Sequence, residues 1–187
     1  YFGFFPKIAL AKQEGLKDAR PCQPSAQELA RSRSLNFPDA APFPGGRLRL
    51  LDRIECWLPE GGPHSLGFIR ATRRVMPEEW FFKAHFHQDP VVPGSLGLES
   101  FLQLLKFMSV ARWGHERGVR HETVATGERH EWTYRGQVIP GDSLVTVEAL
   151  VTGVDEARRL LRADGTLSVD GRVIYAMKDF TVRQVSP

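Results

Sequence analysis

A long apolar segment that follows a proline-rich turn is the feature that most restricts how this chain can fold. From Ser95 to Trp113 the segment contains no proline, and its apolar positions leave only a narrow polar stripe made of Glu99, Gln103 and Lys106. Their spacing of i, i+4 and i+7 places all three on one face of an α-helix. We therefore predict a long helix that other parts of the chain cover on most of its sides.

The polar stripe also argues against a membrane-spanning helix. Glu99 and Lys106 lie inside the segment, and the uncharged run between them is far shorter than the roughly 20 apolar residues that a span requires. A carboxylate in a largely buried helix is costly unless it is paired or used chemically. Glu99 is therefore the residue whose role most needs an explanation.

The residues before this helix predict a strand and then a sharp turn. The run from Trp80 to His87 is rich in aromatic residues and has no Gly or Pro, which favours an extended strand. Pro90 and Pro93 follow, and each proline biases the residue before it away from the helical conformation. This arrangement places His85 near the end of a strand and Glu99 in the first turn of a helix, on the two sides of one turn.

The rest of the chain consists mainly of predicted strands. The Asp170-Gly171 pair predicts a tight hairpin, because a primed turn needs φ > 0 at both central positions. Short turns of this kind join antiparallel strands. The predicted strands cover residues 47–58, 65–75, 123–139, 143–152, 158–169 and 172–185. A curved antiparallel sheet wrapped around one long helix satisfies both halves of the pattern, so we predict an α+β chain with the hot-dog fold.

Residues 1–45 differ in composition from residues 46–187. The stretch from Asn36 to Gly46 is rich in Pro, Ala and Gly, and Ser25 followed by Glu28 has the spacing of a capping box that begins a short helix. The first residues are too apolar for a free tail. We therefore predict an interdomain connector over residues 1–45, packed on a neighbouring domain, and one hot-dog domain over residues 46–187.

Composition narrows the classes of partner. The net charge is +3, but Lys and Arg are scattered and form no basic stripe interleaved with exposed aromatic residues, so the sequence indicates no nucleic-acid binding. The two cysteines, Cys22 and Cys56, lack the spacing of a zinc site or of a disulfide framework. We expect a protein of the reducing cytoplasm, without a membrane segment and without a bound metal.

His85 and Glu99 are the acid-base pair that the local pattern brings together. A histidine titrates near neutral pH and can take a proton from the carbon next to a thioester, and a carboxyl group can donate a proton to a departing hydroxyl. Gly94 and Ser95 mark the start of the helix, where backbone N–H groups without helical partners can polarise a carbonyl oxygen. Together these groups describe the elimination of water from a 3-hydroxyacyl thioester.

The motif around these residues resembles that of a known enzyme family. The run KAHFHQDPVVPGSLGLESFLQLLKF, residues 83–107, places an acid fourteen positions after a histidine. It is similar to the active-site motif of bacterial β-hydroxyacyl-ACP dehydratases of the dehydratase/isomerase type, and most similar to the dehydratase domains of polyunsaturated fatty acid synthases and related polyketide synthases. The similarity covers about residues 46–185. One departure is Glu99 in place of the Asp of the free-standing bifunctional enzyme, which is compatible with dehydration and leaves isomerisation open.

This resemblance implies a role for each motif residue. His85 and Glu99 would be the catalytic pair, the Gly94 amide would donate to the thioester carbonyl, and Ser95 would lie beside it in the substrate-binding site. The implied reaction converts (3R)-hydroxyacyl-ACP to trans-2-enoyl-ACP. It needs no cofactor, because the substrate is carried on the phosphopantetheine of an acyl carrier protein, which is the implied partner. In the family the histidine of one hot dog faces the acid of another, so a second hot-dog domain is also implied, either as a second copy or as an adjacent domain of the same polypeptide.

Other interpretations of the same residues stay open at the level of sequence. Without the motif, a histidine at a strand end is more often structural. The alternative interpretation of Glu99 is a carboxylate that stabilises the start of a helix through the helix dipole. His85, His87 and Asp89 can together form a metal triad, because alternate strand residues share a face.

Two other functions of the chain also stay open, as does the role of three arginines on a predicted strand. The chain can be a non-catalytic half of a double hot dog, or a hot-dog thioesterase, in which a carboxylate activates water. The presence of both His85 and Glu99 argues against the non-catalytic half, and His85 argues against the thioesterase, which needs no histidine at the strand end. Arg158, Arg159 and Arg162 form either a contact for the acidic carrier protein or a solvated strand face.

Overall fold

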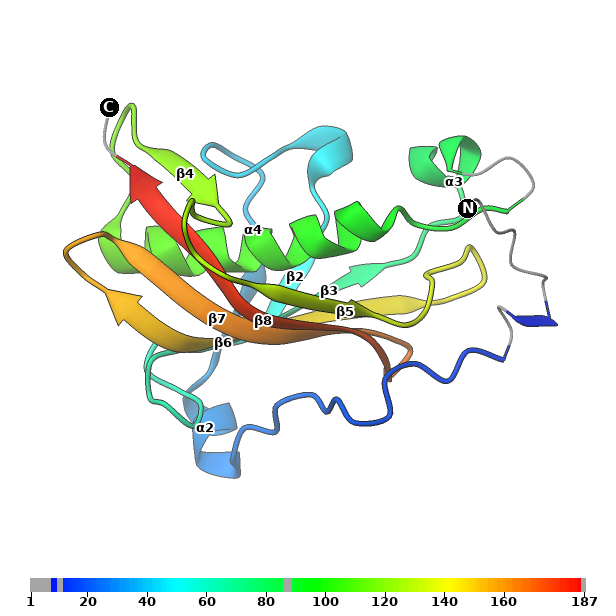
Figure 1. Ribbon diagram of the computed structural model, residues 1–187, viewed down its shortest axis with the longest axis horizontal. Coiled ribbons are helices and arrows are strands. Elements are labelled where there is room, and N and C mark those ends of the chain that lie inside the picture. Colours follow the sequence, from blue (N-terminus) through cyan, green and yellow to red (C-terminus); the bar gives the residue numbers. More distant parts are fainter. Residues whose placement is uncertain (1–7, 10–11, 86–88, 186–187) are drawn as a thin grey trace.

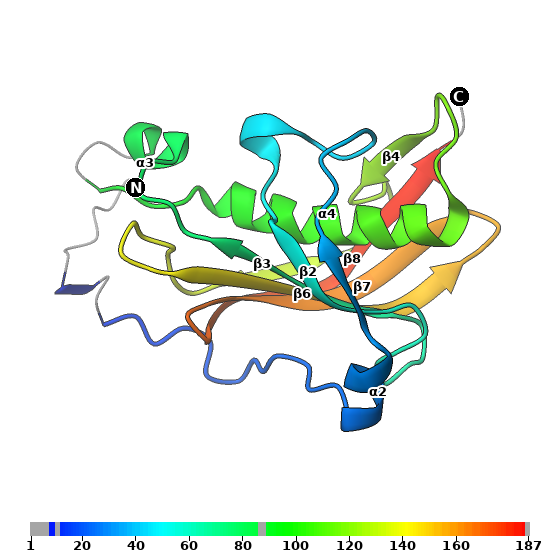
Figure 2. The same cartoon turned by 180° about the vertical axis from the view of Figure 1, so that it is seen from behind.

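One face of a curved β-sheet holds a long helix in this protein, and residues near the N-terminus run across the opposite face (Figures 1 and 2). The computed structural model describes residues 8–9, 12–85 and 89–185. The helices are α2 (Ala26–Arg31), α3 (Trp80–Ala84) and α4 (Gly94–Trp113), with a 3₁₀ turn at Gly46–Leu48. The strands are β1 (Arg33–Asn36), β2 (Arg53–Leu58), β3 (Phe68–Arg74), β4 (Arg120–Thr123), β5 (Glu131–Tyr134), β6 (Leu144–Asp155), β7 (Leu160–Val169) and β8 (Arg172–Val185).

The sheet has the topology expected of a single layer folded around a helix. Its eight strands have the order β1-β2-β3-β6-β7-β8-β4, and β5 pairs with β8 off this path. Every pairing is antiparallel. Irregular pairings interrupt the ladders between β6 and β7 and between β7 and β8, and such bulges increase local twist and bend a strand. The predicted α+β hot-dog architecture is therefore confirmed.

Helix α4 confirms the helix that the apolar periodicity predicts, and it begins one residue earlier. Phe101, Leu104 and Leu105 are 0% exposed and belong to one core cluster with the inward side chains of the sheet. Complete burial of an apolar side chain of this size contributes about 1.5–3 kcal/mol, so this face holds the helix on the sheet. Across the described residues, none of the helices has the length and apolar character to cross a membrane.

The hairpin between β7 and β8 forms as predicted. Asp170 and Gly171 have φ values of 47° and 83°, and Val169 pairs with Arg172 across the turn. Aspartate and glycine suit this turn because both tolerate the left-handed region of backbone conformation. The turn leads into β8, whose first half pairs with β5 and whose last residues pair with β4.

The strand predicted from Trp80 to His87 is wrong. Its first residues form the helix α3, and His85 follows in an extended conformation with φ −140° and ψ 92°; residues 86–88 lie outside the described part of the chain. Phe81 and Phe82 are both buried, and their ring centroids are 4.8 Å apart. A strand would point these two neighbours to opposite faces, so burial of both rings favours the helix over the β propensity of the run.

The strand predicted over residues 123–139 is not continuous: Thr123 is the last residue of β4, a loop follows, and only Glu131–Tyr134 forms a strand, β5. Val124 and Gly127 in this loop have positive φ values of 56° and 84°, which are incompatible with an extended run. The strand predicted from residue 47 also starts later than expected, at Arg53. In both places the backbone pairs over a shorter stretch than the sequence predicts.

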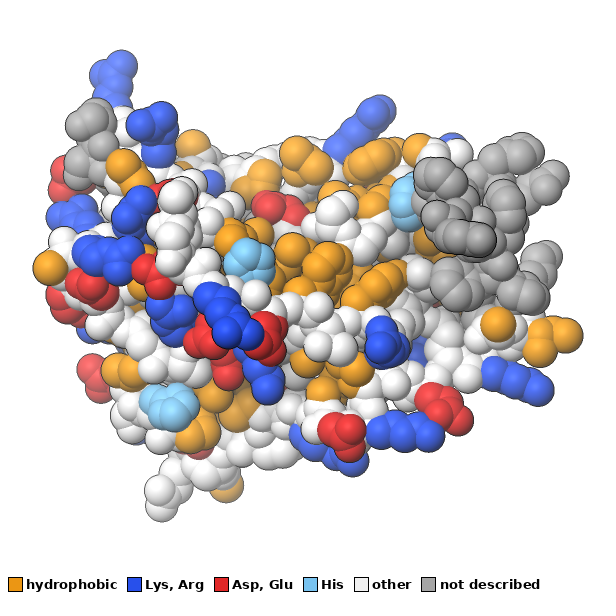
Figure 3. All heavy atoms as spheres, viewed as in Figure 1, with side chains coloured by type: hydrophobic (Ala, Val, Ile, Leu, Met, Phe, Trp, Pro, Cys, Tyr) orange, Lys and Arg blue, Asp and Glu red, His pale blue; other side chains and the backbone are white. Residues whose placement is uncertain are grey.

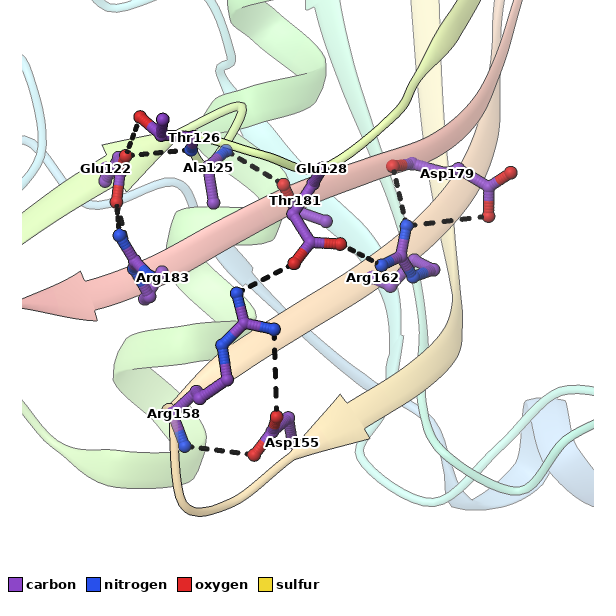
Figure 4. Close-up of polar contacts among 10 residues, drawn as sticks. All are labelled: Glu122, Ala125, Thr126, Glu128, Asp155, Arg158, Arg162, Asp179, Thr181 and Arg183. Atoms are coloured by element: carbon purple, nitrogen blue, oxygen red, sulfur yellow. Dashed lines mark hydrogen bonds and ion pairs between the residues drawn. The ribbon is translucent and has the colours of Figure 1, made fainter.

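A charged network holds the loop between β4 and β5 over β7 and β8 (Figure 4). Glu128 accepts a hydrogen bond from Arg158 at 2.8 Å and also pairs with Arg162. Glu122 accepts from Arg183 Nε at 2.9 Å and from the Thr126 N–H at 2.9 Å. Arg158 and Arg162, which the sequence offered as contacts for a carrier protein, therefore use their guanidinium groups within the chain.

The segment predicted to be a connector contributes to the sheet and to the core. Strand β1 pairs with β2, and the next residue, Phe37, is 2% exposed in the main cluster. The capping box is confirmed, because Ser25 Oγ accepts from the Glu28 N–H at 3.2 Å and the Glu28 carboxylate accepts from the Ser25 N–H at 2.9 Å. Residues 19–28 and the outer face of the sheet border a cavity of about 690 Å³. The apolar first residues of the chain lie outside the described part.

Candidate active site

His85 lies at the C-terminal end of α3, next to the turn that leads into α4. Its N–H donates to the Phe81 carbonyl at 2.8 Å, and its carbonyl accepts from the Val91 N–H at 3.0 Å. The ring Nδ1 lies 3.3 Å from the Val91 carbonyl oxygen. Since a carbonyl oxygen can only accept, Nδ1 carries the proton in this contact, and Nε2 is then the basic nitrogen of the neutral ring. The half-buried imidazole thus has the tautomer of a base that works through Nε2.

Glu99 lies in the second turn of α4 rather than in the first turn as predicted, because the helix begins at Gly94. Its carboxylate accepts a hydrogen bond from Gln103 Nε2 at 3.1 Å. Gln103 is 1% exposed, donates to the Leu48 carbonyl at 2.8 Å and accepts from the Leu50 N–H at 3.2 Å. This buried amide ties Glu99 to the loop before β2. The polar stripe in the sequence contains Gln103 but does not reveal this role.

The polar stripe continues to Lys106, which interacts electrostatically with Glu99. Burial lowers the pKa of Lys106, and the Glu99 carboxylate acts in the opposite direction. His121 of β4 is affected by the same ammonium group: burial, Lys106 and His115 lower the pKa of His121 to about 4. His121 is therefore neutral at pH 7, and Lys106 is the cation of this stripe.

The start of α4 presents backbone donors without a side-chain cap. Pro93 occupies the N-cap position and makes no side-chain hydrogen bond, and the Leu96 N–H donates to the Pro93 carbonyl at 2.9 Å. Within the described residues, the N–H groups of Gly94 and Ser95 have no acceptor. The N-terminus of a helix favours negative charge, so these two amides are suited to a carbonyl oxygen that gains negative charge.

An aromatic cluster from two strands packs on the same end of α4. Trp132 and Tyr134 of β5 both make edge contacts with Tyr175 of β8, with ring centroids 5.5 Å and 4.9 Å apart. Tyr175 is 2% exposed, and its hydroxyl donates to the Gly94 carbonyl at 3.4 Å. Sequence reasoning missed Tyr175 at this site because the contact joins residues 81 positions apart, and no local pattern encodes it.

A narrow apolar slot lies beside the first two turns of α4. Its walls include Phe81, Val92, Leu96 and Ser100, together with side chains of β3, β6 and β7. The slot has a volume of about 40 Å³, far below the roughly 300–1,000 Å³ of typical ligand pockets. It is too small to hold a long acyl chain in the described chain alone.

His85 and Glu99 lie on the two sides of the turn, as the sequence predicts. No hydrogen bond or ion pair joins them in the described part of the chain. The metal triad proposed from the sequence includes His87, which lies outside that part. Among the residues that are described, no group of three or more His, Cys, Asp or Glu side chains is placed to hold a metal ion.

Comparison with known proteins identifies both a sequence family and a fold. A family model described as the FabA-like domain matches residues 43–178. The dehydratase heterocomplex ApeI:P from Xenorhabdus doucetiae is 14% identical, with a TM-score of 0.54 over 83% of this chain and 93% of that chain. A mutant thioesterase from Pseudomonas aeruginosa is 14% identical, with a TM-score of 0.48 over 71% of this chain and 80% of that chain. At these identities the structural likeness shows the fold alone.

Proposed function

Because the chain belongs to the FabA-like domain family, we propose that it dehydrates 3-hydroxyacyl thioesters. The substrate is a (3R)-hydroxyacyl group carried by an acyl carrier protein, and the product is the trans-2-enoyl thioester. The biological setting that we propose is the dehydratase part of a polyunsaturated fatty acid synthase or a related polyketide synthase in the cytoplasm. The motif at residues 83–107 supports this setting.

The contact between His85 Nδ1 and the Val91 carbonyl oxygen is the observation that carries the proposal. The contact with the Val91 carbonyl places the ring proton on Nδ1, so Nε2 can accept a proton from the substrate. In the proposed reaction Nε2 takes the proton from the α carbon, and negative charge develops on the thioester oxygen. The amides of Gly94 and Ser95 stabilise that charge. The electron pair then forms the bond between the α and β carbons while the β hydroxyl leaves.

Glu99 acts as the acid in this reaction. Its proton passes to the leaving hydroxyl, so that water departs rather than hydroxide. Gln103 donates to the Oε1 atom of Glu99, which leaves Oε2 to carry the transferable proton. The proton taken by His85 returns to Glu99 through solvent, and the net change is the loss of one water. No cofactor is required, because the thioester itself makes the α proton acidic.

A second hot-dog domain is proposed to complete the site. The slot beside α4 is too small for an acyl chain, and hydrophobic side chains gather over the middle of the face seen in Figure 3. Apolar surface of this kind is typical of an interface. The solved structure from Xenorhabdus doucetiae is described as a heterocomplex. We expect either a second copy of this chain or an adjacent hot-dog domain to supply the facing half of the site.

Product analysis tests the reaction class. The purified chain is incubated with a 3-hydroxyacyl pantetheine thioester, and the products are identified by mass spectrometry while released thiol is measured with a thiol reagent. We expect a product lighter by one water with its thioester intact. Release of thiol without an enoyl product would overturn the proposal in favour of a thioesterase. Lack of both products, also with the substrate on an acyl carrier protein, would support the non-catalytic half of a double hot dog.

Subunit complementation tests whether two chains share a site. The inactive variants His85→Ala and Glu99→Gln are mixed under conditions of subunit exchange, and heterodimers are verified by native mass spectrometry. Random exchange gives about half heterodimers, each with one intact site, so activity should return to roughly a quarter of the parent value. No recovery despite verified heterodimers would place both residues in one site of one chain. If the isolated chain is an inactive monomer and becomes active when an adjacent hot-dog domain is added, that domain is the partner.

A further inference from the structure

The ring of Tyr175 fills a notch in α4 that exists only because residue 97 is glycine. A Cβ atom at Gly97 would lie 2.4 Å from Tyr175 Cε2 and 2.8 Å from the Tyr175 hydroxyl oxygen, which is closer than such atoms approach in real structures. Without a side chain at this position, the ring reaches the helix backbone and its hydroxyl donates to the Gly94 carbonyl at 3.4 Å. The sequence places Gly97 inside a long helix, where glycine costs about 1 kcal/mol relative to alanine. The close approach of Tyr175 explains why glycine is there.

We propose that Tyr175 is a positioning residue that holds the Ser95 amide at the start of α4 in the orientation needed to bind the substrate carbonyl. This inference rests on the proposed dehydratase function, because it assigns a purpose to one of the two amides of that site. Tyr175 touches the helix backbone and acts on the substrate only through that backbone.

Peptide planarity connects the tyrosine to the amide. The Gly94 carbonyl and the Ser95 N–H belong to one planar peptide group and point in opposite directions. A hydroxyl that holds the carbonyl therefore also restricts the direction of the Ser95 N–H. A carbonyl oxygen has two lone pairs, so Gly94 can accept from Tyr175 and still accept a hydrogen bond within the helix.

The start of α4 lacks the usual means of fixing a first turn. Its N-cap is Pro93, which offers no side-chain acceptor, whereas a Ser, Thr, Asp or Asn cap would bond to one of the first amides and occupy it. An anchor on the carbonyl side fixes the same turn and leaves the amides available. Tyr175 can serve as this anchor because it lies within the rigid sheet, where its backbone pairs with Leu167 and Tyr134.

The surroundings of Tyr175 keep its hydroxyl in the donor form. Burial, followed by the nearby Tyr134, raises the pKa of Tyr175. The hydroxyl therefore stays protonated at every pH at which a histidine base works, and the contact with Gly94 is preserved. Trp132 and Tyr134 pack against the ring from the side of β5 and prevent it from leaving the notch.

Steady-state kinetics of two tyrosine variants test the proposal. Tyr175→Phe keeps the ring in the notch and removes only the hydroxyl, and Tyr134→Phe is the matched control, since the Tyr134 hydroxyl bonds to Gln137 rather than to α4. Loss of one hydrogen bond to a group that stabilises the transition state should lower kcat of Tyr175→Phe roughly three- to tenfold with little change in KM. Tyr134→Phe should stay within about twofold of the parent in both constants. Equal kcat values for the two variants would overturn the inference, as would a loss confined to KM.

Gly97→Ala provides a second test that does not alter Tyr175. Alanine improves the intrinsic helix propensity but displaces the ring, so kcat should fall at least as far as in Tyr175→Phe while circular dichroism shows an intact helix. The variant that combines Gly97→Ala with Tyr175→Phe should have a kcat only slightly below that of Gly97→Ala alone, because both substitutions remove the same contact. Additive losses would indicate two separate effects and would contradict the proposed anchor.

A spectroscopic measurement separates this inference from the proposed function. The ¹³C resonance of the Gly94 carbonyl reports its hydrogen bonds whether or not the protein turns over a substrate. It should shift in Tyr175→Phe and stay in place in Tyr134→Phe. An unchanged Gly94 resonance would overturn the anchor even in an active dehydratase. A parent protein without dehydratase activity would overturn the proposed function and the catalytic purpose of the anchor, while a shifted resonance would still establish the contact.

Discussion

The two ends of α4 differ in how their polar groups are satisfied. At the C-terminal end, Arg112 pairs with Glu156, which also accepts from Trp113 Nε1 at 2.6 Å, and the network in Figure 4 pairs further carboxylates with arginines nearby. At the N-terminal end, the amides of Gly94 and Ser95 have no acceptor within the described residues, and the Glu99 carboxylate accepts a hydrogen bond from the neutral Gln103 amide. Figure 3 shows charged side chains gathered on the left of the view, towards the ends of β6 and β8. Opposite charges hold one end of the helix in place, whereas the other end keeps donors and a carboxyl group available for a substrate.

Replacement of two histidines, one beside the start of α4 and one in the loop between β4 and β5, should give the largest difference. His85→Ala should lower the rate of enoyl formation roughly 10²- to 10⁴-fold, the usual contribution of a positioned acid-base group. His130→Ala is the matched control, because His130 is exposed in the loop between β4 and β5 and packs on Phe180. Enoyl formation is measured for both variants, with folding checked by circular dichroism. Equal rates for His85→Ala and the parent would remove His85 from the site.

Replacement of the carboxyl group tests whether the N-terminal end needs an acid. Glu99→Gln keeps the hydrogen-bonding shape but cannot protonate a leaving hydroxyl, so turnover should fall roughly 10²-fold. Glu99→Asp should retain measurable dehydration, because the role requires a transferable proton more than a fixed length. The two variants are compared under single-turnover conditions. If Glu99→Gln works at the parent rate, Glu99 has only a structural role.

Two buried glutamines allow stability and activity to be separated. Gln103 joins Glu99 to the loop before β2, and Gln184 of β8 donates to the Gly114 carbonyl at 2.8 Å, just beyond the other end of α4. Gln103→Ala leaves the buried Leu50 N–H without its partner, and Gln184→Ala removes the hydrogen bonds of a buried amide. Each substitution should cost about 1–3 kcal/mol in urea unfolding. We expect only Gln103→Ala to lower kcat of the folded protein as well. A similar kcat for both variants would show that Gln103 does not orient Glu99.

The smallest effect that we expect is a loss of thermal stability at low pH, caused by protonation of Glu122 near the C-terminal end of α4. The Thr126 hydroxyl, the Thr126 N–H and Arg183 lower the pKa of Glu122 from 4.5 to about 2. A carboxyl group whose pKa is lowered by folding stabilises the folded state when ionised, so this stabilisation is complete above about pH 4.5 and is lost as the pH falls to about 2. The difference in Tm between the parent and Glu122→Gln should therefore shrink across that interval in calorimetry. A difference that does not depend on pH would exclude this role for Glu122.

Features that depend on neighbouring residues could be predicted from the amino-acid sequence. The apolar periodicity predicts α4, the Asp170-Gly171 pair predicts the hairpin, and the Ser25-Glu28 spacing predicts the capping box. The motif also indicates His85, Glu99, Gly94 and Ser95 as candidate site residues, and their roles stay predictions. The helix, the hairpin and the capping box could be predicted because helix periods and turn conformations depend on residues a few positions apart. The motif spacing that indicates the site residues is equally local.

Features that depend on contacts across the chain were decided only by the tertiary structure. The run after Trp80 has the composition of a strand, yet burial of Phe81 and Phe82 makes it a helix. Gln103 finds its partners in the loop before β2, and Tyr175 reaches Gly97 from the last strand. The physical reason is that side-chain burial and long-range hydrogen bonds outweigh local propensities, which differ by only about 1 kcal/mol per residue. Such contacts join residues that no spacing in the sequence relates, and they determine how the start of α4 presents its amides.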